Sequence, residues 1–404
     1  MTSRTLRLLI IAITLANVLF AAPARAQTGE FPVRARYTFG EQITFTGVLP
    51  LGSKTESATL FFLAQGELKT RSGTATVDSA GQVRYVANLD DDPIRAFSTV
   101  AYWFEVTLKN GQTLKSERGS LYYEDNRFEW RKRASADFRV HWYEGDDEFA
   151  QSLLDVAELG LENIQKYLPL KLNKPVELYA YASAQEMRVS LQTLGNNWVG
   201  AHADPQLGVM LVSLPRSPEQ RLEMERQIPH ELMHLLLYQW LGVGYGNLPV
   251  WLNEGLASVA ELYPNPDYLT LLDKANDDDK LLPLTSLCQT FPRDASGAFL
   301  AYAQATSFTR YLHQQFGSTG LEKLARAYAD GLSCERGVQT ALGSTLPQLE
   351  RSWRGEAFRE DALLKVLAKL APWLVLLLAL FVSLGFVLIG SKRKSTPQVS
   401  SSSR

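Results

Sequence analysis

Two histidines and a glutamate near the middle of the chain have the residue types and the spacing of a catalytic metal site. The segment 230–234 reads His230-Glu231-Leu232-Met233-His234. On a helix, the side chains at positions i and i+4 lie on one face, about 6 Å apart along the axis. Two imidazoles at that spacing can bind one zinc ion with near-tetrahedral angles. Glu231 is rotated by about 100°, so we expect its carboxylate at the open coordination position, where it takes a proton from water.

A zinc site of this kind needs a third protein ligand, and the next apolar segment offers Glu254. Residues 249–257 read PVWLNEGLA, with a proline suited to the first turn of a helix. Glycines at positions 242, 244 and 246 allow the chain to turn back between the two helices. A helical glutamate by itself is more often a solvated charge, but a buried carboxylate needs a cation or a partner. We therefore predict that Glu254 completes the site.

The pairing of HELMH with WLNEGLA resembles the gluzincin group of zinc metallopeptidases, in particular the aminopeptidase-N-like enzymes and the bacterial peptidase MA-like domains. This resemblance implies that His230, His234 and Glu254 hold one Zn²⁺ ion and that Glu231 is the general base. It covers about residues 136–358, and its specific part is 229–261. Nineteen residues separate His234 from Glu254, one more than in the aminopeptidase-N-like pattern, and no Gly-Ala-Met-Glu-Asn-like segment is found. Aminopeptidase activity is therefore in doubt, and endopeptidase activity stays open.

Hydrolysis of an amide also requires a donor to the oxyanion, and relatives commonly use a downstream Tyr or His. Tyr302 is the prediction, because it lies in a segment of small residues that can pack against the site. Tyr245 and Tyr311 are alternatives. A tyrosine of the packed core would have the same sequence surroundings.

Further polar residues have weaker patterns. Glu261 follows Glu254 by seven residues, so it is either a carboxylate that orients a ligand histidine or an exposed charge. The other three histidines, at positions 141, 202 and 313, have no partner pattern, and we expect each to be structural or exposed. By analogy with relatives, the strand at 208–214 is expected to offer its edge to an extended peptide.

The two ends of the chain predict export and a membrane anchor. Residues 1–26 combine two arginines, an apolar run and a terminal Ala-Arg-Ala, as in a cleaved secretory signal peptide. Residues 371–390 contain no charged side chain, and this segment is long enough for one transmembrane helix. Lys392, Arg393 and Lys394 follow it. This positive cluster favours the cytoplasmic side, so the body is expected outside the cytoplasm. The Ser-rich tail 391–404 is expected to be disordered.

The exported body divides by its hydrophobic pattern. Residues 28–125 contain about seven short runs of β-branched and aromatic residues separated by turn signals, among them Asn110-Gly111, which predicts an all-β sandwich of immunoglobulin or fibronectin type. After the charged stretch 129–133, strands at 138–143, 176–181 and 208–214 alternate with a helix at 146–167, and helices then dominate from 219 to 359. Residues 134–360 are therefore expected to form an α+β domain, and the resemblance implies that this is a zincin-like peptidase domain.

Composition excludes several classes of protein. The formal net charge is −2, so nothing favours nucleic acid as a partner. The two cysteines, Cys288 and Cys334, are too few for a thiolate zinc site, and they are either one disulfide of an exported domain or two unpaired core residues.

The hypothesis that unites these patterns is a membrane-anchored zinc metallopeptidase acting on peptide or protein substrates outside the cytoplasm. Two alternatives stay open: an inert zinc-containing scaffold of the cell envelope, and a zinc hydrolase acting on a non-peptide bond. The substrate, the role of the β-domain and the oligomeric state are not readable from the sequence.

Overall fold

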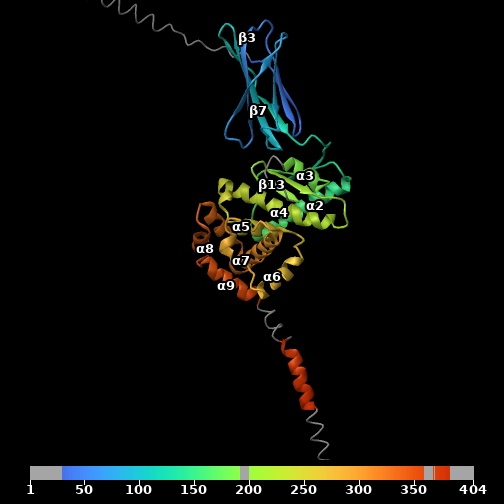
Figure 1. The fold of residues 1–404 in the computed structure, drawn as a ribbon, viewed down its shortest axis with the longest axis vertical. Coiled ribbons are helices and arrows are strands. Elements are labelled where there is room, and N and C mark those ends of the chain that lie inside the picture. The colour runs from blue at the N-terminus through green and yellow to red at the C-terminus, as the bar shows by residue number, and fades with distance from the viewer. Residues whose placement is uncertain (1–29, 192–199, 359–366, 368, 383–404) are drawn as a thin grey trace, which may run out of the picture. The chain divides into compact units, whose positions relative to one another are not determined.

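A computed structural model of the chain describes residues 30–191, 200–358, 367 and 369–382 (Figure 1). The predicted signal peptide (1–26) and the predicted tail (391–404) lie outside these residues. The chain divides into two compact units, of which the first comprises residues 1–158 and 172–235 and the second comprises 159–171 and 236–404. The division therefore does not follow the predicted boundaries, and those boundaries stay a prediction.

The first unit begins with two antiparallel sheets, so the N-terminal region is sheet-rich as predicted. One sheet has the strand order β1-β2-β6-β5; the other has the order β4-β3-β7-β8, with β9 also pairing with β7. The nine strands are β1 (Val33–Thr38), β2 (Gln42–Val48), β3 (Thr55–Ala64), β4 (Arg71–Thr74), β5 (Thr76–Val77), β6 (Gln82–Asn88), β7 (Ser98–Leu108), β8 (Thr113–Lys115) and β9 (Gly119–Tyr123).

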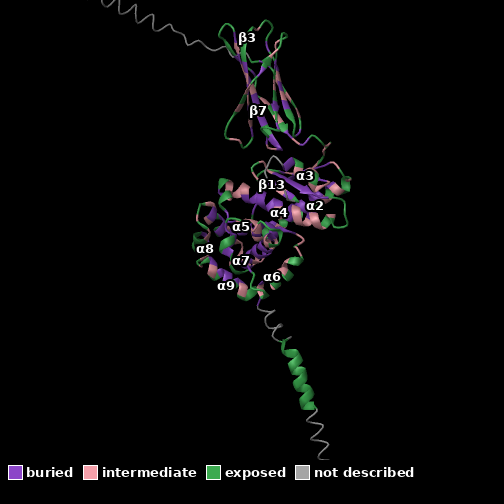
Figure 2. Ribbon diagram, viewed as in Figure 1, coloured by how far each residue is buried: buried purple, intermediate pink, exposed green. Residues whose placement is uncertain are grey.

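Alternation of buried and exposed residues builds the core of this region. Phe45 of β2 has no exposed surface, and its ring lies 5.4 Å from that of Phe62 and 5.0 Å from that of Tyr102. Successive side chains of a strand point to opposite faces, so β2 and β7 bury alternate residues and leave the residues between them more exposed (Figure 2). The predicted hairpin joins β7 to β8, with Gly111 at a φ of 83°.

A third sheet, a mixed one with both parallel and antiparallel strands, follows in the same unit and has the order β10-β11-β12-β14-β13. The pairs β11–β12 and β12–β14 are parallel, and the two outer pairs are antiparallel. The strands of this sheet and the helices between them are β10 (Arg131–Ala134), β11 (Phe138–Trp142), α2 (Asp147–Tyr167), β12 (Val176–Tyr181), α3 (Ala184–Leu191), β13 (Ala201–Asp204) and β14 (Val209–Ser213). Residues 159–167 of α2 belong to the second unit.

The expectation for the strand at 208–214 is wrong. This strand is β14, an inner strand with neighbours on both sides, and the edge of the sheet is β13. The sequence misleads here because β13 is only four residues long and includes Asp204, whereas all five residues of β14 are buried and apolar apart from Ser213. A short edge strand has a weak periodic signal.

The segment that follows β9 is fixed to the mixed sheet by a buried carboxylate. The Asp125 side chain is fully buried, and Arg127 donates two hydrogen bonds to it at 2.8 and 2.6 Å. The Tyr181 hydroxyl of β12 donates a third at 2.9 Å, and the Trp130 indole donates to the Asp125 carbonyl. Removing one of these partners should be strongly destabilising, because the buried charge would then be left uncompensated.

His141 of β11 belongs to a neighbouring polar cluster and is structural, as expected. Its ring is 3% exposed, stacks on Tyr179 at 4.1 Å and lies with Nε2 2.6 Å from a Glu177 carboxylate oxygen. Arg139 donates to the other oxygen at 2.7 Å. Burial by itself would raise the pKa of Glu177, but the hydrogen bonds from His141 and Arg139 hold that pKa below its usual value.

The remaining described residues, from 220 to 358, are mainly helical, as the sequence predicts. Helix α7 contacts α5, α6, α8, α9 and η2, so the other helices of the second unit pack around it (Figure 1). The elements are α4 (Gln220–Leu241), η2 (Gly242–Asn247), α5 (Val250–Ala260), α6 (Asp267–Asp277), η3 (Leu284–Leu287), α7 (Ala295–Ala329), α8 (Cys334–Leu342) and α9 (Leu346–Ala357).

Cys288 and Cys334 form a disulfide, which resolves the alternative that the sequence left open. Their Cα atoms are 6.1 Å apart although 46 positions separate them in the chain. The bond joins the segment after η3 to the first residue of α8, and so closes a loop that contains α7.

Residues 369–382 are helical, and their side chains are exposed along the whole segment (Figure 2). In the portion of the chain that the structure describes, no helix is long and apolar enough to cross a membrane. The predicted span of 371–390 extends beyond these residues, so the anchor stays a prediction.

Replacing Glu177 by Gln should lower stability at neutral pH. The folded-state pKa of Glu177 is depressed, so the stabilisation is present above the ordinary pKa of 4.5 and is lost as the pH falls through the lowered value. We expect a loss of about 1 kcal/mol at pH 7 that disappears at acidic pH, below the lowered pKa of Glu177, measured by denaturant unfolding from neutral to acidic pH. Glu56→Gln, at an exposed position of β3, is the control, and an equal loss in both variants would contradict the assignment.

Removing the disulfide should destabilise the chain more strongly. Closing a 46-residue loop is worth about 4 kcal/mol in chain entropy, so the double variant Cys288→Ser, Cys334→Ser should unfold at a clearly lower temperature. Calorimetry with and without a reductant provides the check. A reductant should lower the melting temperature of the parent chain and leave that of the variant unchanged; an unaffected parent would show that the bond contributes no stability.

Candidate metal centre

Helix α4 carries both histidines, and its residues 231–237 are all buried. Leu232, Met233 and Leu235 are fully buried, and Glu231 and His234 are each only 8% exposed. The apolar neighbours keep this turn of the helix in place and exclude water from most of it. His230 and His234 lie one turn apart on the same face, with ring centroids 5.2 Å apart and ring planes at 75°.

Helix α5 positions Glu254 through contacts at its beginning. The helix starts directly after Pro249, and the Val250 N–H donates to the Cys288 carbonyl at 3.0 Å. One residue before Glu254, the Asn253 amide donates to the Tyr245 hydroxyl at 3.1 Å. The first turn of α5 is thus tied to η2 and to the half-cystine at position 288.

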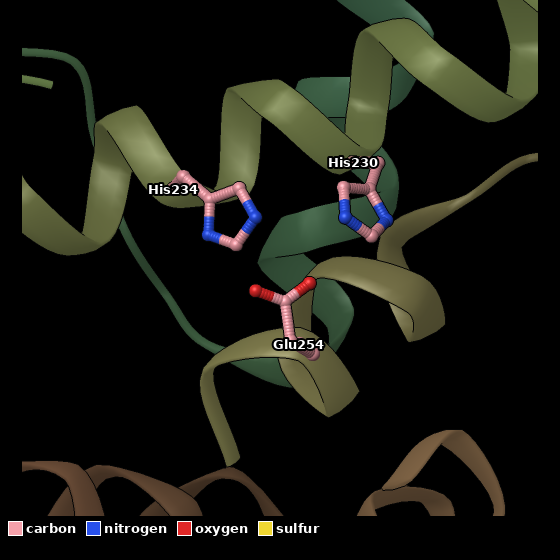
Figure 3. A group of neighbouring side chains, drawn as sticks. All are labelled: His230, His234 and Glu254. Carbon is pink, nitrogen blue, oxygen red and sulfur yellow. The ribbon is translucent and has the colours of Figure 1, made fainter. Parts of the chain in front are cut away.

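Close packing against α7 holds the other side of α5. A Cβ atom added to Gly255 would lie 2.2 Å from the Thr309 hydroxyl and 2.7 Å from the Ala305 carbonyl oxygen. Only glycine fits at this distance. The helix that approaches so closely is α7, whereas Glu254 points away from it toward α4 (Figure 3).

The three predicted ligands converge. The donor atoms of His230, His234 and Glu254 all lie within 4.8 Å of one another, and Figure 3 shows the carboxylate directed at both imidazoles. Zinc ligands in a tetrahedral site are about 3.4 Å apart, so small side-chain rotations would close this cluster on an ion. Two neutral nitrogen donors and one carboxylate oxygen are the donor set of an open zinc site, and these residues therefore fit such a metal.

Glu231 occupies the helix position next to His230 and stands outside the group of three ligands. Its carboxylate influences His202 of β13, the edge strand, and so does the His234 imidazole. Burial lowers the pKa of His202, and the carboxylates of Glu231 and Asp204 offset only part of this effect.

His202 thus lies within electrostatic range of the site, which sequence reasoning missed. A lone histidine in a four-residue strand has no spacing pattern. Only the pairing of β13 with β14, which sets His202 opposite Leu211, determines where it lies.

The candidate tyrosines have different surroundings. Tyr302 is half-buried in α7, with its ring edge-on to Phe291 at 5.0 Å. Tyr311 is 8% exposed, packs on Phe308, and its burial raises the pKa of the phenol, as for a core residue. The Tyr245 hydroxyl accepts a hydrogen bond from the side chain of Asn253, the residue before Glu254. The assignment of Tyr302 as oxyanion donor stays a prediction.

Two further polar residues can now be placed. Glu261 is 7% exposed, so it is not an exposed charge; it follows the last residue of α5 as the C-cap, and its predicted orienting role is untested. His313 contacts the Tyr167 ring at 4.8 Å and the Ser318 hydroxyl at 3.3 Å, in agreement with a structural role.

Residues 156–358, half of the chain, match the model of the Peptidase MA superfamily. No curated protein matches the sequence. Among solved structures, an aminopeptidase N family protein from Idiomarina loihiensis is 8% identical, with 81% of this chain and 70% of that protein covered and a TM-score of 0.30.

Two other solved structures match a smaller share of this chain. A polysaccharide deacetylase from Bacillus cereus is 9% identical over 42% of this chain and 58% of its own length, with a TM-score of 0.20. A structure described as a myokine is 7% identical over 24% of this chain and 96% of its own, also with a TM-score of 0.20. At such TM-scores these similarities carry no functional argument.

A metal-content measurement tests the ligand set. The purified chain should retain a divalent metal in stoichiometric amount, and His234→Ala should lower it strongly, because two remaining ligands hold an ion far more weakly than three. His313→Ala is the matched control and should keep its metal. Unchanged metal in His234→Ala, determined by mass spectrometry of the element, would exclude His234 as a ligand.

Proposed function

Because this chain belongs to the Peptidase MA superfamily, we propose that it is a membrane-anchored zinc metallopeptidase that hydrolyses peptide bonds outside the cytoplasm. The observation that carries this proposal is the convergence of His230, His234 and Glu254, with Glu231 beside them on α4. Together they supply the three ligands and the general base that metal-assisted hydrolysis requires.

His230, His234 and Glu254 would hold the ion. A zinc ion bound there would lower the pKa of a coordinated water and polarise the scissile carbonyl. The deep burial of α4 supports this role, because electrostatic interactions are stronger where water is excluded.

Glu231 acts as the acid and base of the reaction. Its carboxylate accepts a proton from the attacking water and then passes it to the nitrogen of the leaving amine. The side chain is 8% exposed, so it is held in place by its surroundings rather than moving freely in solvent. Tyr302 would donate to the oxyanion that develops on the carbonyl oxygen.

Export and anchoring are part of the same proposal. The disulfide between Cys288 and Cys334 supports an oxidising compartment outside the cytoplasm. The apolar side chains of residues 369–382 are exposed, which supports their burial in a lipid bilayer as the first part of the span at 371–390.

Replacing Glu231 by Gln should separate metal binding from turnover. The amide has the same shape but cannot accept the proton, so we expect full zinc content and a loss of hydrolysis of about 10²- to 10⁴-fold. Cleavage of a fluorogenic peptide library, with and without a chelator, measures this. Glu225→Gln on the same helix removes only an ion pair with Arg221 and should remain active.

The same library decides the mode of cleavage. Peptides with a blocked amino terminus should be hydrolysed as well as free ones, because no segment for binding a substrate amino terminus was recognised. Undiminished turnover by Glu231→Gln, or cleavage that is indifferent to the chelator, would refute the proposed mechanism.

A further inference from the structure

Three arginines lie together on the outer face of the sheet β1-β2-β6-β5. Arg34 and Arg36 are on β1 and Arg84 is on β6, and all three are exposed. They line a hollow of about 730 Å³ whose floor includes Thr44 and Thr46 of β2. We call Arg34, Arg36 and Arg84 the arginine face.

Strand register fixes their spacing. Arg34 pairs with Thr46, and Thr46 pairs with Arg84, so these two arginines flank one threonine and are about 10 Å apart at Cα. Arg36 follows Arg34 by two residues on the same face, about 7 Å along the strand.

No negative charge of the sheet balances this face. The four strands of the sheet contain no Asp or Glu. Among the described residues, none of the three guanidinium groups has an ion-pair partner, whereas three other arginines of the unit, Arg71, Arg95 and Arg127, are each paired with a carboxylate.

The concentration of charge is local, because the whole chain carries a formal net charge of −2. Like charges at this spacing repel one another, so an anion that bridges them is favoured. Arginine binds carboxylates through two parallel N–H···O bonds.

The geometry matches an extended acidic peptide. Carboxylates at alternate positions of an extended chain repeat every 7 Å or so, the same period as Arg34 and Arg36, since both follow the repeat of a β-strand. Strand β1 is also an edge of its sheet, the position at which an extended peptide can align with a sheet. We propose that the arginine face binds an acidic, extended segment of the protein substrate, at a distance in sequence from the metal ligands.

That the ligand is a substrate rests on the proposed function. Binding of the acidic peptide itself can be tested without turnover. The probe is a fluorescent peptide with Glu at alternate positions, added to the full-length Glu231→Gln chain in detergent. A peptide with Gln in place of each Glu is the control. Fluorescence anisotropy at low and moderate salt gives the two affinities.

The triple variant Arg34→Gln, Arg36→Gln, Arg84→Gln should weaken binding of the Glu peptide about tenfold, as expected for three exposed charge pairs. Lys54→Gln, Lys69→Gln, Lys109→Gln removes the same charge from exposed positions elsewhere in this region and should have little effect. Equal losses in both triple variants, or no preference for Glu over Gln, would overturn the proposal.

Binding of other polyanions tests the chemical class of the ligand. If heparin or vesicles of anionic phospholipid bind through the arginine face and the Glu peptide does not, the ligand is of another class and the proposal is wrong. In the active chain, a substrate carrying the acidic segment should show a raised KM and an unchanged kcat in the arginine variant. Peptide binding without any hydrolysis by the active chain would instead contradict the proposed function and leave the docking site in place.

Discussion

The candidate metal centre depends on one constraint, the direction in which α5 presents the Glu254 carboxylate. The two histidines need only a continuous helix, since their spacing puts them on one face. Glu254 needs a second helix in a fixed position and rotation. The absence of a side chain at Gly255 lets α5 lie against α7, and the bond from Asn253 to Tyr245 fixes its beginning. A shift of α5 would move the carboxylate out of reach of both imidazoles.

The disulfide belongs to the same supporting structure. The Cys288 carbonyl accepts the N–H of Val250, four residues before Glu254, and the Trp251 indole donates to the Cys334 sulfur at 3.4 Å. The covalent bond therefore touches the first turn of the helix that carries the third ligand. A cross-link at this point restricts the motions that would misplace the ligand.

The β-rich region contributes in a different way. Its inner faces form a conventional aromatic core, and the segment after it is fixed to the mixed sheet by the buried Asp125 carboxylate. Its outer surface is not uniform: the arginine face is wholly basic in a chain of nearly balanced charge. The region thus combines a buried, hydrogen-bonded connection to the mixed sheet with the basic surface proposed to bind an extended acidic ligand.

Short-range patterns were sufficient to place His230 and His234 on one face of a helix and to predict most strands and helices, because each follows from a period of 2 or 3.6 residues. The approach of Glu254 to these histidines depends on how α5 packs. Contacts between distant segments needed the tertiary structure. The sequence could not decide whether Cys288 and Cys334 pair, which strand is the edge, or that His202 lies near Glu231. Alternating arginines on β1 are visible in the sequence, but Arg84 joins them only through the pairing of β1, β2 and β6. Such proximities depend on the path of the whole chain, which no local repeat encodes.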